Sequence, residues 1–210
     1  MKKTILRRYA ELLAQCGLNV KKGDVVLINA ELDQPAFVAM AVEACYKAGA
    51  ARVIVDWDYQ PLQKLHVRYR SQKNLGTMED FEIARLQYRL DKNPAMLYLL
   101  SADPDGLKGM NQKKHAKAMQ MRYPVIKTYR DQMENRYKWC IAAVPGRAWA
   151  KKVFPSLSPA AAVERLWQAI LYTSRVIDRD GQPLDPIAEW DKHNSNFAEK
   201  CNKLNALHLT

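Results

Sequence analysis

The sequence predicts an α/β protein, with a parallel sheet of about four strands flanked by helices and a helical C-terminal extension. One observation behind this prediction is the alternation of short apolar runs with longer segments of helical periodicity, a pattern typical of strand–helix–strand units with right-handed crossovers. The other is the run Val25–Ile28, where four apolar residues follow one another. Such a run indicates a strand that is covered on both faces, as in a parallel sheet.

The N-terminal part of the chain predicts two helices and a second strand around that first strand. Apolar residues at helical spacing follow Thr4, a residue suited to an N-cap, and predict a first helix that stops at Gly17. Pro35 suits the first position of a second helix. Gly49 closes this helix before a second strand at Arg52–Trp57.

The same alternation continues with longer crossovers. In chain order we expect a mostly helical stretch, a strand, two helices and a strand: Pro61–Asp91, Met96–Leu100, Asn111–Met121, Pro124–Arg136 and Trp139–Val144. The apolar positions of the first stretch are contributed by Phe81, Ile83, Leu86 and Leu90. Pro124 predicts a break between the two helices, because proline lacks the backbone N–H that a helix interior requires.

From Ser158 onward the pattern is helical. Ser158-Pro159 opens a strong amphipathic helix, and a turn at Asp178–Gln182 leads to a final helix over Ile187–Leu204. We expect three parts along the chain, an α/β domain, a helical extension that packs on it, and an apolar ending from which we expect the natural protein to continue: residues 1–157, 158–203 and 204–210.

Composition bounds the class of protein. The chain has 210 residues, of which 48% are hydrophobic, enough for a sizeable core. No apolar run approaches the roughly 18–20 residues that span a bilayer. Arg7, Arg8 and Glu11 interrupt any apolar stretch of a signal peptide, so we expect a cytoplasmic protein. The four cysteines form no C-x-x-C pair, which argues against a zinc ribbon and fits reduced thiols.

Polar residues follow the predicted strands at the edge where ligands bind in parallel α/β sheets. These are Asn29, Asp56, Asp58, Ser101, Asp103, Asp105 and the pair Pro145-Gly146. Carboxylates gathered there suit a hard cation such as Mg²⁺, but Asp, Pro and Gly are also the residues that turns require. The turn interpretation is the simpler one. Ala30–Asp33 replaces the glycines of a phosphate-binding loop, which argues against a dinucleotide cofactor.

The sequence contains no self-sufficient active site. Four histidines lie outside any metal-binding or catalytic motif: His66, His115, His193 and His208. No G-x-S-x-G elbow occurs, and Cys140 lies within a predicted strand with no histidine nearby in the sequence. Three tryptophans at helical positions favour core or interface anchors over a ligand cage: Trp149, Trp167 and Trp190. We therefore assign no catalytic and no metal-binding residue to this chain.

Several stretches of the chain nevertheless occur in a telling order and spacing: Tyr9–Ile28, Ala44–Trp57, Ser101–Gly109, Trp139–Leu157, Ala162–Ile170 and Asp185–Leu207. Together they resemble the dinuclear-metal aminopeptidases of the thermophilic type, known as aminopeptidase S or aminopeptidase T. The most informative stretch is WCIAAVPGRAWAKKVFPSL, from Trp139 to Leu157. Gly146-Arg147 departs from the family pattern, in which a threonine is expected after the proline, but this position concerns a turn.

The resemblance implies an enzyme that releases N-terminal amino acids from peptides. It implies two divalent metal ions (zinc, cobalt or similar) that activate a water and polarise the scissile carbonyl, and a homodimer. The family's ligands, including an H-x-D pair, and its catalytic tyrosine belong to a C-terminal domain, and no position here matches them. The resemblance therefore implies an inactive, non-catalytic N-terminal domain whose partner is its own missing catalytic domain. Residues 204–210 would begin the passage to that domain, and Trp167, Trp190 and Leu207–Leu209 would face it.

The alternative is a stand-alone basic α/β module. The formal net charge is +11, and the segments Lys64–Lys73 and Lys113–Lys117 would contact nucleic acid or an acidic partner. Basic residues are spread over several segments instead of one helix. The scaffold role is therefore favoured, and nucleic acid is not the expected partner.

Overall fold

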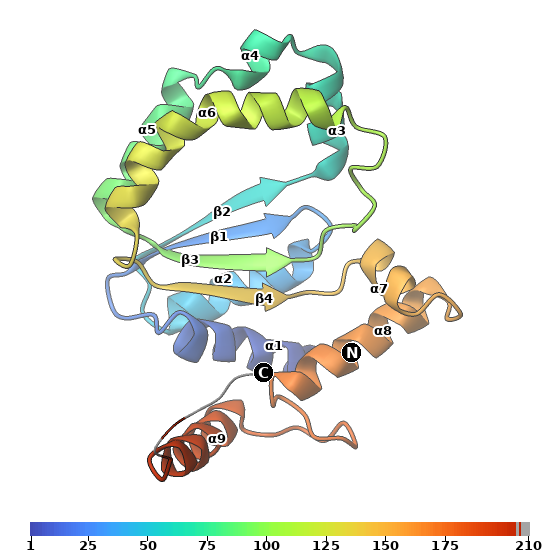
Figure 1. Ribbon diagram of the computed structural model, residues 1–210. Helices are drawn as coiled ribbons and strands as arrows, with labels where there is room; N and C mark the ends of the chain where they lie inside the picture. Colours follow the sequence, from blue (N-terminus) through green and yellow to red (C-terminus); the bar gives the residue numbers. More distant parts are fainter. Residues whose placement is uncertain (205, 207–210) are drawn as a thin grey trace.

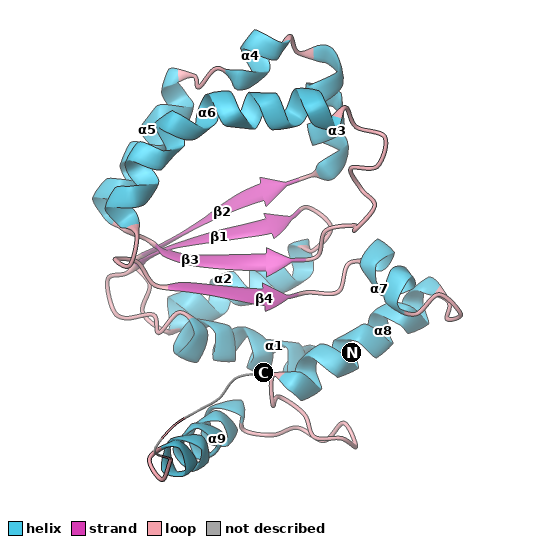
Figure 2. Cartoon of the chain, in the orientation of Figure 1, coloured by secondary structure: helices cyan, strands magenta, loops and turns pink. Residues whose placement is uncertain are grey.

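A four-stranded parallel sheet with helices on both faces forms the centre of the molecule (Figures 1 and 2). The computed structural model describes residues 1–204 and 206. The strand order is β2-β1-β3-β4, and all three neighbouring pairs are parallel. The bounds are Val25–Glu31 (β1), Arg52–Asp58 (β2), Ala95–Leu100 (β3) and Trp139–Ala143 (β4). The α/β class and the parallel sheet predicted from the sequence are confirmed.

The main core lies between one face of the sheet and four helical segments: α1 (Lys3–Leu12), the π-helical turn η1 (Leu13–Gly17), α2 (Pro35–Lys47) and α8 (Pro159–Thr173). Alternate residues of β1, such as Val26 and Ile28, are fully buried in it. Tyr9, Phe37 and Trp167 pack ring against ring between α1, α2 and α8. Trp167 is only 7% exposed, so the expectation that it faces a partner is wrong.

The opposite face carries the helices of the two long crossovers: α3 (Gln60–Tyr69), α4 (Gln72–Gly76), α5 (Asp80–Lys92) and α6 (Gln112–Met133). A second, smaller cluster of buried residues joins α3, α4 and α6. Phe81, one of the apolar positions expected there, is exposed. It lies in the first turn of α5, a helix that has no fully buried residue.

Pro124 does not separate two helices. It lies inside one continuous helix, α6, which runs for 22 residues. Pro124 and Gln120 are both exposed, so water can hydrate the Gln120 carbonyl that loses its helical hydrogen bond. The predicted break is therefore wrong because the affected backbone faces solvent.

The last third of the chain is helical, as predicted. It comprises α7 (Arg147–Val153), α8 and α9 (Pro186–Cys201), with the predicted turn closed by an isolated bridge between Ile177 and Pro183. The Trp190 indole donates to the Ser174 carbonyl oxygen, at 3.1 Å, and is partly covered. Leu207–Leu209 and His208 lie outside the described residues. The predicted domain boundary at residue 157 stays a prediction.

No helix in the described part of the chain is long and apolar enough to cross a bilayer.

Candidate functional site

A depression with a volume of about 950 Å³ lies at the carboxyl ends of β1, β2 and β3. The chain leaves β1 through α2 on one face of the sheet and leaves β2 through α3–α5 on the other (Figure 1). The strand order therefore reverses beside β1, which is where ligands bind in open α/β sheets. The volume is within the range of small-molecule sites.

One wall of this depression is acidic and comes from the loops after β1 and β3. The Ser101 hydroxyl donates to Oδ1 of Asp33 at 2.8 Å, and Ser101 itself is buried. Gly146 lies so close that an added Cβ would be 2.1 Å from the Ser101 carbonyl oxygen. A residue without a side chain is therefore required where the loop after β4 meets this wall.

Glu31, the last residue of β1, belongs to the same wall. Its pKa is raised, chiefly because burial disfavours the charged carboxylate, and further because Asp58 and Asp33 lie nearby. Asp58 is the register partner of Glu31 on β2. The wall is thus a region of crowded negative charge.

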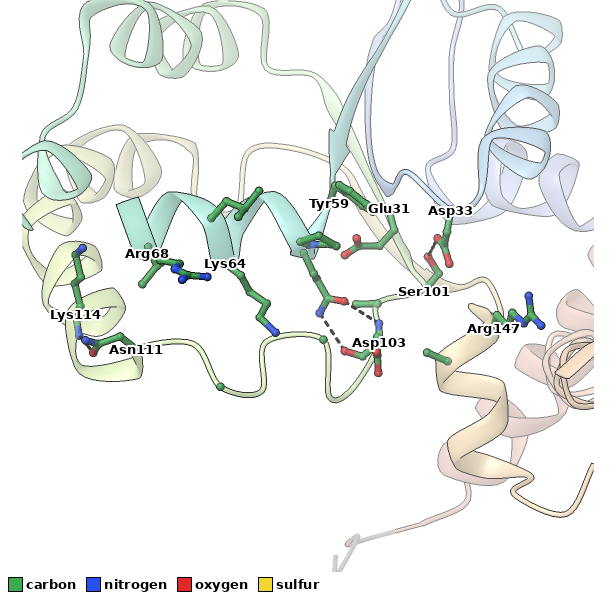
Figure 3. A pocket seen from close by; sticks show the side chains of 18 residues that line it. Glu31, Asp33, Tyr59, Lys64, Arg68, Ser101, Asp103, Asn111, Lys114 and Arg147 are labelled. Carbon is green, nitrogen blue, oxygen red and sulfur yellow. Dashed lines mark hydrogen bonds between the residues drawn. The ribbon is translucent and has the colours of Figure 1, made fainter. Parts of the chain in front are cut away.

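The floor is fixed by a clamp from the first turn of α3. The Gln60 amide donates from Nε2 to the Asp103 carbonyl oxygen at 3.0 Å and accepts from the Asp103 backbone N–H at 3.1 Å (Figure 3). Asp103 in turn accepts from the Asp105 N–H. An added Cβ at Gly106 would be 2.2 Å from Gln60 Oε1. The Asp103–Gly106 loop therefore has the turn function that its composition predicts.

The other wall is basic and comes from α3 and the start of α6. Lys64 and Arg68 extend from α3, and Lys114 extends from α6 (Figure 3). Lys64 Nζ donates to the Lys108 carbonyl oxygen at 2.9 Å, and Lys114 Nζ donates to the Arg70 carbonyl oxygen. None of the ion pairs found among residues 1–204 and 206 involves a charged residue that lines the depression.

The structure brings only part of the predicted edge residues together. Ser101 and Asp103 line the depression. Asp56 instead binds two arginines of α5, with 2.5 Å to Arg85 and 2.7 Å to Arg89, and Asp105 pairs with Lys152 at 2.8 Å.

Asp58 accepts from the Gln63 side chain, and the Asn29 amide nitrogen is buried without a partner in the described part. Within that part no three His, Cys, Asp or Glu side chains are placed to hold a metal ion. Arginine, lysine and glutamine side chains contact the carboxylates of Asp56, Asp105 and Asp58. This arrangement favours the turn interpretation over a magnesium site, and the absence of a metal-binding residue stays a prediction.

The histidines and cysteines form no catalytic pair in the described part. His66 is exposed on α3, His115 is partly covered, and His193 contacts Arg175 at 2.8 Å from the exposed side of α9. Burial raises the pKa of the Cys140 thiol, and it raises the pKa of Cys45 to about 11. Raised values leave little thiolate near neutral pH, so neither cysteine is an activated nucleophile.

Sequence reasoning missed several residues of the depression. Glu31 and Asp33 belong to the acidic turn Ala30–Asp33. The acidity of this turn was used only to exclude a dinucleotide cofactor, and these two residues were not considered as part of a site. Gln60 carried no signal, because its role depends on Asp103, which lies 43 positions away.

Comparison with known proteins gives a consistent result. The family model described as thermophilic metalloprotease (M29) matches residues 2–210. Aminopeptidase PepS of Streptococcus thermophilus is 31% identical over 98% of this chain and 50% of its own length. Aminopeptidase AmpS of Bacillus subtilis is 31% identical over 97% of this chain and 48% of its own length.

A solved structure agrees with these matches. Wild-type AmpT from Thermus thermophilus superposes with a TM-score of 0.78 at 27% identity, over 92% of this chain and 46% of that one. The chain spans about half the length of the curated relatives that it matches.

Proposed function

Because the chain belongs to the thermophilic metalloprotease (M29) family, we propose that it is the N-terminal, non-catalytic domain of a cytoplasmic metallo-aminopeptidase. In this proposal the whole enzyme releases N-terminal amino acids from peptides by two-metal hydrolysis. This chain supplies the α/β scaffold and one wall of the substrate cavity. Its partners are its own C-terminal catalytic domain and a second copy of the enzyme.

The proposal rests on two observations: the chain matches the family over nearly its whole length, yet its described residues offer no group that could hold the metals of such an enzyme. The family match covers nearly the whole chain, yet the chain corresponds to only about half of its relatives. At the carboxyl edge, Asp56 pairs with Arg85 and Arg89, Asp105 pairs with Lys152, and Asp58 accepts from Gln63. Across the described part, Glu31 and Asp33 included, no three His, Cys, Asp or Glu side chains are placed to hold a metal ion. The described residues therefore do not fit a two-metal centre, and the proposal assigns the metals to another part of the enzyme.

The face of the sheet opposite the main core supports the scaffold role, because large apolar side chains on it are exposed. Leu100, Trp139 and Ile141 lie on one face of β3 and β4, as the strand register requires, and they are 54%, 59% and 55% exposed. Parallel sheets are normally covered on both faces, and a contiguous apolar surface usually marks an interface. We assign this surface to the contact with the rest of the enzyme.

The test is an activity assay on the purified chain. We expect no hydrolysis of leucine p-nitroanilide above a metal-only blank with Zn²⁺, Co²⁺ or Mg²⁺, because the described residues lack a metal-binding group. A full-length relative assayed in parallel serves as the positive control. Turnover by this chain that a chelator abolishes would show that it holds a metal centre, and the proposal would fail.

A further inference from the structure

The net positive charge of the chain resides in two segments of its sequence. Residues 60–78 and 106–130 contain eleven lysines and arginines but no aspartate or glutamate. The other 22 basic residues are matched by the 22 acidic residues of the chain. The formal charge of +11 therefore belongs entirely to these two segments, and the rest of the chain is neutral.

The fold packs the two segments against each other. Residues 60–78 contain α3 and α4, and residues 106–130 contain most of α6. Val67, Leu75, Met110 and Ala118 form a small shared core, and Figure 1 shows α3, α4 and α6 together on one side of the sheet. We call this unit the basic lobe.

Most cations of the basic lobe have no carboxylate partner. Within the described residues, only Arg122, Lys127 and Arg130 form ion pairs, and the other eight cations form none. Lys113 and Lys114 stand in the first turn of α6, which has no acidic residue and where the helix dipole disfavours positive charge. Concentrated, uncompensated charge of this kind opposes folding, which points to a binding role.

Exposed aromatic rings lie among these cations. Tyr69 at the end of α3 is 73% exposed, and the Arg68 guanidinium carbon lies 5.3 Å from its ring centroid. On α6, the Arg130 guanidinium lies 5.4 Å from the exposed Tyr123 ring. Lys64, Arg68 and Lys114 also form the basic wall of the depression (Figure 3).

We propose that the basic lobe binds single-stranded nucleic acid, with lysine and arginine side chains on the phosphates and a base stacked on Tyr69. Cationic surfaces with exposed aromatic rings bind single strands in this way without sequence preference. An acidic protein segment would use the cations but would gain nothing from an exposed tyrosine ring. The acidic wall at Glu31 and Asp33 limits the strand to the side of the depression formed by α3 and α6.

The first test measures the binding of a fluorescein-labelled 20-nucleotide oligo-dT by anisotropy over a salt series. Lys73, Lys113 and Lys117 are exposed, and their ammonium groups make no hydrogen bond in the described part. Replacing all three with glutamine should reduce the slope of log K against log salt by about 2 and weaken binding about 100-fold at 0.1 M salt. The matched control replaces three other lysines with glutamine: Lys3, Lys22 and Lys192, which are exposed and lie outside the lobe. It should weaken binding only about twofold, since these charges act at long range.

The second test separates nucleic acid from acidic protein. Tyr69→Ala should weaken oligo-dT binding about tenfold without changing the salt slope, because stacking releases no counterions. A 20-residue polyglutamate peptide should compete poorly. The proposal fails if oligo-dT does not bind, if the control triple weakens binding as much as the lobe triple, or if Tyr69→Ala has no effect. It also fails if polyglutamate competes equally, which would assign the lobe to acidic proteins. Circular dichroism checks that each variant is folded.

Discussion

Gly146 is the residue where the backbone approach at the candidate site is tightest. An alanine there would place its Cβ 2.1 Å from the Ser101 carbonyl oxygen, which belongs to a buried residue and cannot move freely. We expect Gly146→Ala to lower the free energy of unfolding by about 1–3 kcal/mol. Gly76→Ala is the matched control, because its Cβ would meet the flexible Met121 side chain. Urea denaturation that shows equal losses for the two variants would contradict the described contact.

Glu31 links the charge of the site to pH. Its pKa is raised on folding, so the folded state holds this proton more tightly than the unfolded state does. Stability from this group is present below the unfolded pKa and falls as pH rises through the folded pKa. Glu31→Gln should therefore raise the free energy of unfolding at pH 7, and the difference should disappear at about pH 3, where the carboxyl is protonated in both states. Urea denaturation that shows destabilisation by Glu31→Gln at pH 7 would refute the assignment.

The sequence predicts an N-cap residue for two helices, and the structure contains one of these two caps. The Ser158 side chain caps α8 by accepting from the Ala161 N–H at 3.3 Å, as its position before Pro159 predicts. Thr4, the residue predicted to cap the first helix, lies inside α1, which begins at Lys3 without a side-chain cap. The predicted cap at Thr4 is therefore wrong.

The contrast between Ser158 and Thr4 can be tested by substitution. Ser158→Ala should cost about 1 kcal/mol of stability, and Ser158→Asn should restore most of it, because asparagine is an equally good cap. Thr4→Ala should change stability by less than about 0.5 kcal/mol. Thermal or urea unfolding measures all three variants, and a larger loss at Thr4 than at Ser158 would reverse the assignment of the caps.

Elements with a strong local signal could be predicted from the sequence. The apolar run of β1, the proline at the start of α2 and the serine cap of α8 are all local features. The break at Pro124 failed because its effect depends on whether the freed carbonyl can reach water, which only the tertiary structure decides. The prediction that Trp167 faces a partner failed for a similar reason. The rings of Tyr9 and Phe37 that cover Trp167 come from helices distant in the sequence.

Across the fold, the sequence predicted the edge of the sheet where a depression forms but not the residues of its walls. Ser101 and Asp103 were candidates and do line it. The ion pairs of Asp56 with Arg85 and of Asp105 with Lys152 could not be predicted. Both basic residues come from helices whose placement depends on the fold. The segments Lys64–Lys73 and Lys113–Lys117 were identified from the sequence as a basic alternative. Their union into one lobe could not be predicted, because they lie together only when α3, α4 and α6 pack around a shared core.

We propose that the chain is the scaffold of a metallo-aminopeptidase and holds no metal centre of its own. Equilibrium dialysis of the purified chain against Zn²⁺ or Co²⁺, followed by elemental analysis, tests it most directly. The account predicts far less than one tightly bound ion per chain, because the carboxylates of Asp56 and Asp105 are held by basic side chains. One or two stoichiometric ions, lost when Asp56 or Asp105 is replaced by asparagine, would contradict it.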